Sequence, residues 1–176
     1  PTHAAIVHLE EAGKIEMVVT QNVDGLHSRA GTSEARLVEI HGTNTRVECV
    51  ACRSRSDPQP HFDSFRDTRV PPRCACGGLL KTATISFGQD LVAADLQRAE
   101  AAALRADLVV ALGSTLSVFP AASLPLIAAG RGVPYVIVNR GATEHDPRPE
   151  VSLRLEGDVQ ALFPEAADAA LALSSP

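Results

Sequence analysis

Residues 15–27 read Ile-Glu-Met-Val-Val-Thr-Gln-Asn-Val-Asp-Gly-Leu-His, and Glu39-Ile40-His41-Gly42-Thr43 follows a short distance along the chain. Ile15 and the apolar residues 17–19 predict a buried strand, and polar side chains crowd the point where that strand should end. Open α/β sheets bind their ligands at the carboxyl ends of strands. The two segments therefore indicate an enzyme active site at a strand end.

Strand and helix patterns alternate through the second half of the chain, and we expect the chain to open directly into a helix. The expected elements are a helix over 91–105, a strand over 106–112 ending at Gly113, a helix over 120–129, a strand over 133–138 ending at Asn139, a strand around 151–155, and a helix to about Leu173 capped by Asp158. This order predicts an α/β fold with a mostly parallel sheet covered by helices.

The composition limits the classes of protein to consider. A chain of 176 residues that is 45% hydrophobic and 21% charged has enough apolar residues for the core of one domain. A net charge of -5 and no block of lysine or arginine argue against direct binding of nucleic acid. No apolar run approaches the roughly 20 residues that span a bilayer, and no secretory signal is evident, so we expect a cytoplasmic protein without membrane contact. The only methionine is Met17, and we therefore expect that a segment upstream has been omitted.

The four cysteines form two close pairs, Cys49-x2-Cys52 and Cys74-x-Cys76. Two pairs of thiolates supply the four tetrahedral ligands that structural zinc prefers. The second pair is one residue shorter than usual and requires an unusual backbone path. Four unconnected cysteines and disulfides are the alternatives, and a reducing cytosol disfavours disulfides. Residues 53–72, between the pairs, have little periodicity and predict a loop-rich excursion.

Small polar residues follow two of the expected parallel strands. Gly113-Ser114-Thr115 and Asn139 occupy positions where the ribose and phosphates of a nucleotide would lie across the sheet ends. Glycine permits close backbone approach, and the hydroxyl groups can donate to phosphate or ribose oxygens. Each of these residues has a purely structural alternative as part of a turn, and Asp158 as a plain helix cap.

Six motifs, in this order, resemble those of the sirtuins, the NAD-dependent protein-lysine deacylases, over about residues 1–173. They are Thr20 to His27, Glu39 to Thr43, the paired cysteines, Phe87-Gly88-Gln89, Gly113 to Val118, and Ile137-Val138-Asn139. The resemblance implies a Rossmann-type large domain (1–45 and 84–176) with helices on both faces of its sheet and a small inserted zinc module (46–83). It also implies NAD as co-substrate, one structural Zn²⁺ bound by the four cysteines, and an acyl-lysine protein or peptide as substrate.

The resemblance also implies roles for individual residues. His41 matches the general base that takes a proton from an NAD ribose hydroxyl, and an imidazole titrates close enough to neutrality for that task. Asn22 matches the residue that positions the ribose and a water, and Asp24 the contact to the nicotinamide carboxamide. The other cofactor-binding positions are Gln21, Val23, Gly113, Ser114, Thr115, Asn139, Asp158 and Val159, and the substrate peptide would lie between Ile85, Phe87, Gly88, Gln89 on one edge and Leu116, Ser117, Val118 on the other.

Several of these residues keep alternative interpretations. Asp24 before Gly25 could form a turn only, and Phe87 could serve packing. We expect His27 to be a core or helix-surface histidine, and His3, His8, His61 and His145 to be solvated.

The sirtuin pattern has one departure here, since the first strand with a Gly-Ala-Gly phosphate loop lies upstream of residue 1 in that family. The expected function is NAD-dependent protein-lysine deacylation that yields nicotinamide, free lysine and an O-acyl-ADP-ribose. The alternatives are a non-catalytic acyl-lysine peptide-binding fragment and a protein mono-ADP-ribosyltransferase.

Overall fold

The computed structural model describes residues 1–173. The chain divides into two compact units. The first, which we call the sheet unit, comprises residues 1–19, 26–38 and 93 onward, and the second, the cysteine unit, comprises residues 20–25 and 39–92. Among residues 1–173, no helix combines the length and the apolar character needed to cross a bilayer.

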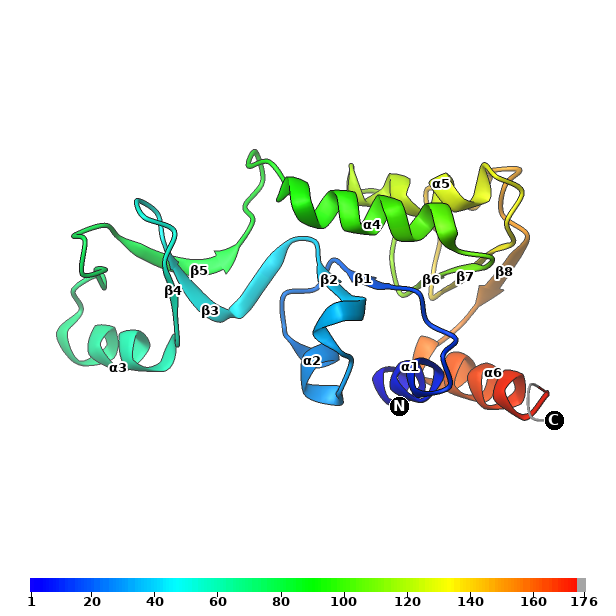
Figure 1. Cartoon of the computed structure of the whole chain (residues 1–176), viewed down its shortest axis with the longest axis horizontal. Helices are drawn as coiled ribbons and strands as arrows, with labels where there is room; N and C mark the ends of the chain where they lie inside the picture. Colours follow the sequence, from blue (N-terminus) through cyan, green and yellow to red (C-terminus); the bar gives the residue numbers. More distant parts are fainter. Residues whose placement is uncertain (174–176) are drawn as a thin grey trace. The chain divides into compact units, whose positions relative to one another are not determined.

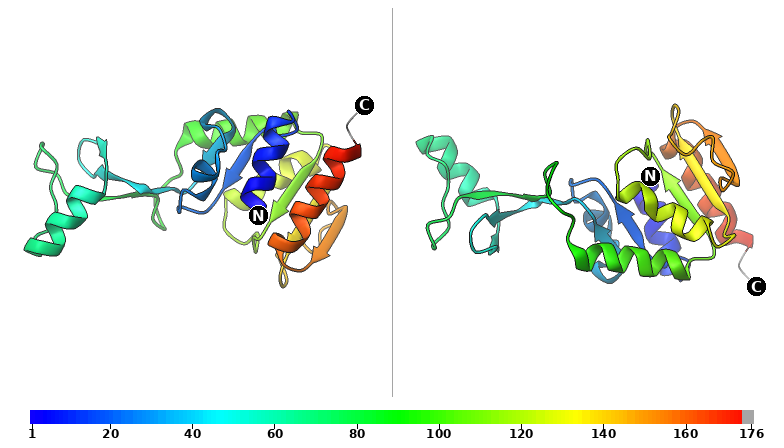
Figure 2. Two further views of the ribbon diagram at one scale, coloured as in Figure 1. Left: turned by 90° about the horizontal axis from the view of Figure 1, so that it is seen from below. Right: turned by 90° about the horizontal axis from the view of Figure 1, so that it is seen from above.

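The sheet unit contains a parallel sheet in the order β6-β7-β8. Its elements are α1 (Thr2–Glu11), α2 (Leu26–Ala30), the 3-10 helix η1 (Glu34–Arg36), α4 (Ala93–Arg105), β6 (Val109–Leu112), η2 (Ala121–Ser123), α5 (Leu124–Ala129), β7 (Tyr135–Asn139), β8 (Leu153–Glu156) and α6 (Val159–Leu173). Helices α4 and α5 cover one face, and α1 and α6 lie side by side on the other (Figures 1 and 2). The predicted parallel α/β sheet with helices on both faces is confirmed.

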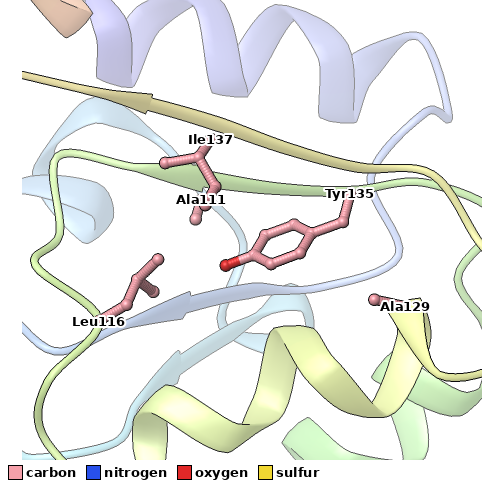
Figure 3. Close-up of a cluster of buried hydrophobic side chains, with 5 residues drawn as sticks. All are labelled: Ala111, Leu116, Ala129, Tyr135 and Ile137. Atoms are coloured by element: carbon pink, nitrogen blue, oxygen red, sulfur yellow. The ribbon is translucent and has the colours of Figure 1, made fainter. Parts of the chain in front are cut away.

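The core of this sheet is built from small and branched side chains around one aromatic ring. Tyr135 and Ile137 on β7 are completely buried and pack with Ala111, Leu116 and Ala129 (Figure 3). Alternate residues of β7 face this cluster because side chains of a strand alternate between its two faces. Burial of the ring raises the pKa of Tyr135 above its ordinary value.

Residues 15–20 form a shorter and less buried strand than expected. The strand β1 (Val18–Thr20) pairs with β2 (Leu37–Glu39) in a separate two-stranded sheet. Ile15, Met17 and Val18 are half-buried and Val19 is 36% exposed, so the prediction of a buried strand was wrong in its degree of burial. The physical reason is that β2 is the only strand paired with β1 among residues 1–173.

The cysteine unit contains an antiparallel sheet in the order β4-β3-β5. Its elements are β3 (Gly42–Cys49), β4 (Arg55–Ser56), α3 (Gln59–Thr68) and β5 (Leu80–Thr84). The prediction of a loop-rich segment over 53–72 was wrong, because ten of these residues form the helix α3. Asp57 accepts a hydrogen bond from the Gln59 backbone at 2.7 Å, which satisfies a free amide at the start of the helix.

Candidate functional site

The ends of β1 and β2 hold the two polar motifs of the cysteine unit together. The Ile40 backbone donates to the Thr20 carbonyl at 3.0 Å. Just beyond, the Asn22 backbone donates to the Thr20 hydroxyl at 3.1 Å, and the Asn44 backbone donates to the Val23 carbonyl at 2.8 Å. The segment 20–24 is therefore fixed along its length against residues 40–44.

His41 is half-buried and its ring contacts this segment directly. Its Nδ1 lies 3.1 Å from the Gln21 carbonyl oxygen. A carbonyl oxygen only accepts, so Nδ1 must carry the proton and donate it. In the neutral imidazole this assignment leaves the lone pair on Nε2, and that nitrogen is then able to act as a base.

Two glycines near His41 allow close contacts between the backbone and neighbouring residues that a side chain would block. Gly42 has φ +75°, and a Cβ there would lie 2.2 Å from the Ala83 carbonyl oxygen. Gly25 has φ +69°, and a Cβ there would lie 2.6 Å from a methyl group of Thr45. The backbone amide of Ile85, the residue that follows β5, donates to the His41 carbonyl at 2.8 Å, next to the close approach that Gly42 permits.

Acidic side chains lie near the same segment. Burial raises the pKa of Glu39, while a hydrogen bond from Thr43 lowers it and the negative charge of Asp24 raises it. Asp24 is half-buried. The carboxyl groups of Glu39 and Asp24 therefore lie within electrostatic reach of one another.

The turn after β5 carries the residues expected to contact a peptide. The Ser86 backbone donates to the Gln89 side chain at 2.9 Å, and the Gln89 backbone donates to the Ser86 carbonyl at 3.0 Å. Gly88 in this turn has φ +84°. Phe87 is 97% exposed, so it does not pack within the described residues, and Lys81 donates to the Gln89 side chain at 3.3 Å. Phe87 is thus exposed to solvent on a turn that is fixed by hydrogen bonds.

The four cysteine sulfurs form one cluster in the cysteine unit. All four Sγ atoms lie within 4.8 Å of one another, with 3.5 Å between Cys49 and Cys76 and 3.7 Å between Cys52 and Cys74. Four Zn–S bonds in a tetrahedron would place the sulfurs about 3.8 Å apart. A disulfide requires about 2.05 Å between sulfurs. The donor set therefore fits a structural zinc ion and not a pair of disulfides.

The short Cys74-x-Cys76 spacing is accommodated by a tight turn. The Gly77 backbone donates to the Cys74 carbonyl at 2.8 Å, and the Cys74 backbone donates to the Gly78 carbonyl at 2.8 Å. A Cβ on Gly78 would lie 2.6 Å from the Cys49 sulfur. Hydrogen bonding by the Ser54 side chain and backbone lowers the pKa of Cys52 to about 6. The Gly78 backbone hydrogen bond lowers the pKa of Cys76, but hydrogen bonding with Cys52 and Cys49 outweighs it and raises that pKa to about 11.

The ends of the parallel strands in the sheet unit bring the other predicted residues together. The Gly113 backbone donates to the Val138 carbonyl at 2.9 Å, and the Gly157 backbone donates to the Asn139 carbonyl at 3.1 Å. Gly113 has φ +60°, and a Cβ there would lie 3.6 Å from Val159. Because β6, β7 and β8 are parallel, the residues that follow them lie at one edge of the sheet.

Asn139 and Asp158 each make local hydrogen bonds at this edge. The amide nitrogen of Asn139, which is 7% exposed, donates to the carbonyls of Arg140 and Gly141. Asp158 accepts from the Gln160 backbone at 2.8 Å, as expected of a helix cap, and pairs with Arg140 at 2.7 Å. Both side chains thus stabilise the local backbone at the carboxyl ends of the strands.

The loop after β6 divides its side chains between the core and solvent. Leu116 has φ +56° and is 3% exposed, because its side chain belongs to the core cluster. Its backbone amide donates to the Ser114 hydroxyl at 3.2 Å, and the hydroxyls of Thr115 and Ser117 lie 2.8 Å apart. Any contact from Leu116 to a peptide would therefore come from its backbone, whereas Ser117 and Val118 are exposed.

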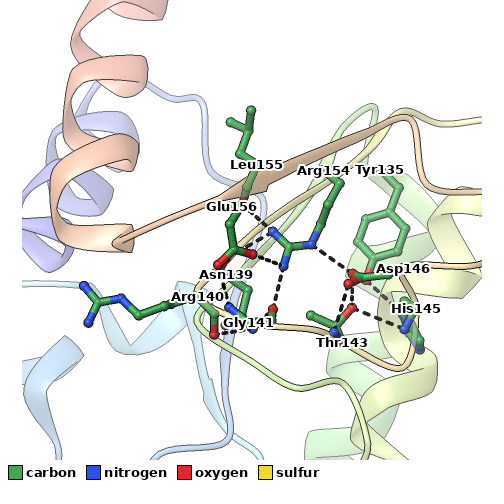
Figure 4. A network of polar contacts seen from close by, with 10 residues as sticks. All are labelled: Tyr135, Asn139, Arg140, Gly141, Thr143, His145, Asp146, Arg154, Leu155 and Glu156. Atoms are coloured by element: carbon green, nitrogen blue, oxygen red, sulfur yellow. Dashed lines mark hydrogen bonds and ion pairs between the residues drawn. The ribbon is translucent and has the colours of Figure 1, made fainter.

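A polar network formed by the loop after β7 and by β8 was missed in the sequence. It includes Thr143, His145, Asp146 and Arg154 (Figure 4). His145 was expected to be solvated, but it is 1% exposed and its Nδ1 lies 2.9 Å from the Tyr135 hydroxyl. The prediction was wrong because the residues next to His145 in the sequence are polar, whereas its burial comes from packing against Tyr135, ten residues away along the chain. By contrast, His27 packs its ring 4.5 Å from that of His3 on α1, as expected.

Comparison with known protein families gives a match to the model of the Sir2 family over residues 1–120. Among curated proteins, the NAD-dependent protein deacetylase of Rhodopseudomonas palustris is 39% identical over 153 residues, which cover 86% of this chain and 60% of that protein. The NAD-dependent protein deacetylase of Haloarcula marismortui is also 39% identical, over 92% of this chain and 61% of its own length. The chain therefore spans about 60% of the length of these curated relatives.

Solved structures that resemble this chain come from the same family. A structure described as "Sir2-p53 peptide-NAD+" superposes with a TM-score of 0.87 at 34% identity, over 98% of this chain and 70% of that chain. A structure described as "Sir2 bound to acetylated peptide" gives a TM-score of 0.85 at 34% identity, over 98% and 69% of the two chains. The likeness thus extends over 98% of this chain.

Proposed function

We propose, because the chain belongs to the Sir2 family, that it forms the greater part of an NAD-dependent protein-lysine deacetylase. The substrates would be NAD and an acyl-lysine protein or peptide, and the products nicotinamide, free lysine and an O-acyl-ADP-ribose. The relatives named as NAD-dependent protein deacetylases and the solved complexes with NAD+ and acetylated peptide support this proposal.

The observation that carries the proposal is the hydrogen bond from His41 Nδ1 to the Gln21 carbonyl oxygen. It directs the lone pair of the neutral ring to Nε2, the atom that would take a proton from a ribose hydroxyl. Asn22 and Asp24 follow directly in the segment that this bond holds, and we assign to them the contacts to ribose and nicotinamide. Gln21 and Val23 complete the cofactor-binding segment.

The sheet unit would supply the remaining cofactor contacts. We assign ribose and phosphate contacts to the backbone and hydroxyl groups at the ends of the parallel strands, namely Gly113, Ser114, Thr115, Asn139, Asp158 and Val159. The polar backbone at such ends is suited to phosphate and ribose oxygens.

The peptide would bind by its main chain, which tolerates many sequences. We assign this contact to Ile85, Phe87, Gly88, Gln89, Leu116, Ser117 and Val118. The exposure of Phe87 supports a ligand contact over a packing role within the described residues. The division into a Rossmann-type domain (1–45 and 84–176) and a zinc module (46–83), and a cytoplasmic location that keeps thiols reduced, belong to the same proposal.

Zinc would be bound by Cys49, Cys52, Cys74 and Cys76 and would act on structure alone. Four thiolates leave no open position for water or substrate, so the ion stabilises the module without taking part in the reaction.

The deciding experiment measures nicotinamide release from NAD in the presence of an acetyl-lysine peptide. We would compare this 176-residue chain with a version extended at its N-terminus by the corresponding segment of the Rhodopseudomonas palustris relative. We expect acetyl-dependent release by the extended version. In it, His41→Ala should reduce release by about 10²-fold or more while peptide affinity stays the same, because the change removes a base and little contact area.

His61→Ala is the matched control, since His61 lies in the same unit and its ring contacts the Ser56 hydroxyl instead of the segment 20–24. It should leave the rate unchanged. Full turnover by His41→Ala would refute the role of His41. Peptide binding without nicotinamide release in either version would favour a binding module, and transfer of ADP-ribose to protein would favour an ADP-ribosyltransferase.

A further inference from the structure

Arg154 on β8 has the most densely bonded guanidinium group in Figure 4, and none of the roles proposed above uses it. Its side chain is 21% exposed. Nη1 donates to the carbonyls of Asn139, at 3.1 Å, and Leu155, and Nη2 donates to the Gly141 carbonyl at 2.6 Å. The group therefore binds the backbone on both sides of the turn at 139–141.

Two carboxylates complete the coordination of Arg154. Its Nε donates to Asp146 at 2.9 Å, and its Nη2 donates to Glu156 at 2.9 Å. Glu156 accepts in turn from the Gly141 backbone at 2.8 Å. The turn is thus bonded both through its carbonyls and through an amide.

Asp146 extends the network into the rest of the loop. It accepts from the Thr143 backbone at 3.0 Å and from the Thr143 hydroxyl at 2.5 Å. These hydrogen bonds, and the nearby guanidinium of Arg154, lower the pKa of Asp146, which keeps it ionised as a partner for that group.

One further hydrogen bond connects this loop with the loop after β6. The Glu144 backbone, next to Thr143, donates to the Thr115 carbonyl at 2.9 Å. The two segments to which we assign cofactor contacts, residues 113–115 and Asn139, are therefore joined through the loop that Asp146 and Arg154 hold. All these residues belong to the sheet unit.

We propose that Arg154 is a positioning residue for NAD, which fixes the turn at 139–141 and, through Asp146, the loop at 113–115. The inference rests on the proposed function, because it concerns the same cofactor. The planar guanidinium presents five N–H donors in a fixed geometry, whereas a lysine has one nitrogen and cannot reach these acceptors together. Holding the loops in their binding conformation lowers the ordering cost of cofactor binding.

The contacts of Arg154 separate this role from a purely structural one. Arg154 bonds to carbonyls and carboxylates at one edge of the sheet, while the core cluster is formed by other residues. The carboxylates of Asp146 and Glu156 are 30% and 64% exposed, so water solvates them when Arg154 is replaced and no buried charge is left unpaired. A change at Arg154 should therefore affect cofactor binding more than folding.

The test uses the extended protein described above and its Arg154→Leu variant. Calorimetry would measure the Kd for NAD and for ADP-ribose, and initial rates would give kcat and the KM values for NAD and for the acetyl-lysine peptide. We expect about a tenfold rise in both Kd values and in the KM for NAD. The KM for peptide and kcat at saturating NAD should change by less than about twofold.

Three further variants sharpen the result. Arg154→Lys should recover part of the affinity, and Asp146→Asn should weaken NAD binding by a smaller factor because it removes the charge but keeps the shape. Arg105→Leu is the matched control, since Arg105 forms an exposed ion pair with Glu16 in the same unit. It should leave NAD affinity unchanged.

Unchanged NAD affinity in a folded Arg154→Leu protein would overturn the proposal. So would an equal loss of NAD affinity, peptide affinity and kcat, which would indicate general damage. The calorimetric result does not depend on turnover, so weaker NAD binding in a protein that proves to have no deacetylase activity would refute the proposed function and support the positioning role.

Discussion

Each of the two units is stabilised internally in a different way. The sheet unit has an apolar core in which Tyr135 and Ile137 are completely buried. In the cysteine unit, none of residues 50–80 is buried, and the sulfur cluster lies where a core would otherwise be. A segment without buried side chains gains little from the hydrophobic effect, so it needs a metal or another cross-link to fold. The comparison shows that one chain uses both solutions, each where its local sequence requires it.

Removal of zinc should give the largest effect and should affect only the cysteine unit. Zinc binding contributes on the order of 10 kcal/mol in small zinc modules, so a chelator or Cys49→Ala should unfold residues 50–80. Proteolysis within this segment and loss of bound zinc would measure the change. Tyr135 is the only tyrosine and the chain has no tryptophan, so its fluorescence reports the sheet unit and should stay the same.

Ser64→Ala, at an exposed position of α3, serves as the control for that experiment. A change of Tyr135 fluorescence together with zinc loss would mean that the two units do not fold independently. Loss of deacetylation in a folded Cys49→Ala protein that still contains zinc would contradict the structural role of the metal.

Substitution in the apolar core should destabilise the sheet unit and leave the cysteine unit unchanged. Ile137→Ala removes three carbons from a fully buried side chain and should lower the free energy of unfolding by about 2–5 kcal/mol. Thermal unfolding followed by Tyr135 fluorescence would measure the loss. Zinc content should be unaffected, and Val110→Ala, at a position that is 36% exposed, should cost clearly less. Equal costs at the two positions would argue against the core as described.

A buried carboxylate gives a smaller test within the cysteine unit. The side chain of Glu48 is 6% exposed and pairs with Arg53 at 2.9 Å and with Arg55 at 2.8 Å. Glu48→Ala should destabilise the unit by about 1–2 kcal/mol, because both arginines are exposed and return to water. The rate of zinc release to a chromogenic chelator would measure this change. Asp63→Ala breaks an exposed pair with Arg66 and should change the rate little; a larger effect at Asp63 would refute the assignment.

The smallest expected effect is a pH dependence confined to the sheet unit. Burial lowers the pKa of His145, the positive charge of Arg148 lowers it further, and the carboxylates of Glu150, Asp146 and Glu144 raise it. The unfolded state then binds more protons than the folded state below the unfolded pKa of about 6.5. The contribution of His145 to stability is therefore complete above that pH and is lost as the pH falls below it, at most about 1.4 kcal/mol by pH 5.5.

Thermal unfolding at pH 7.5 and pH 5.5, followed by Tyr135 fluorescence, would test this prediction. The difference between the two pH values should be smaller in His145→Gln, which does not titrate. An equal difference in both proteins would assign the pH dependence to other groups.

Much of the fold could be predicted from the sequence. The strands β6, β7 and β8 and the helices α4 and α6 fall within a few residues of their expected ranges, because apolar periodicity and the glycines after the strands are local signals. Helix α3 was missed, because prolines and polar residues around Phe62 and Phe65 conceal its short periodic pattern. The cysteine pairs indicated their cluster, although their spacing alone left the backbone path open.

The candidate site was predictable in its parts. The segments around Asn22 and His41 were identified by their residues, but the bond from His41 to the Gln21 carbonyl, and with it the position of the ring proton, came only from the structure. Arg154 carries no signal in the sequence, since nothing near residue 154 indicates a contact with Asn139.

The sequence by itself determined the alternation of helices and strands, the four sulfur ligands and the polar segments at the strand ends, because these depend on residues that are close along the chain. Only the tertiary structure decided that His145 is buried against Tyr135 and that Arg154 binds the turn at 139–141 together with Asp146. The physical reason is the parallel pairing of β7 and β8, which brings Arg154 opposite Ile137 and so within reach of a turn that precedes it by more than ten residues. Contacts of this kind are set by strand register, which is a property of the assembled sheet.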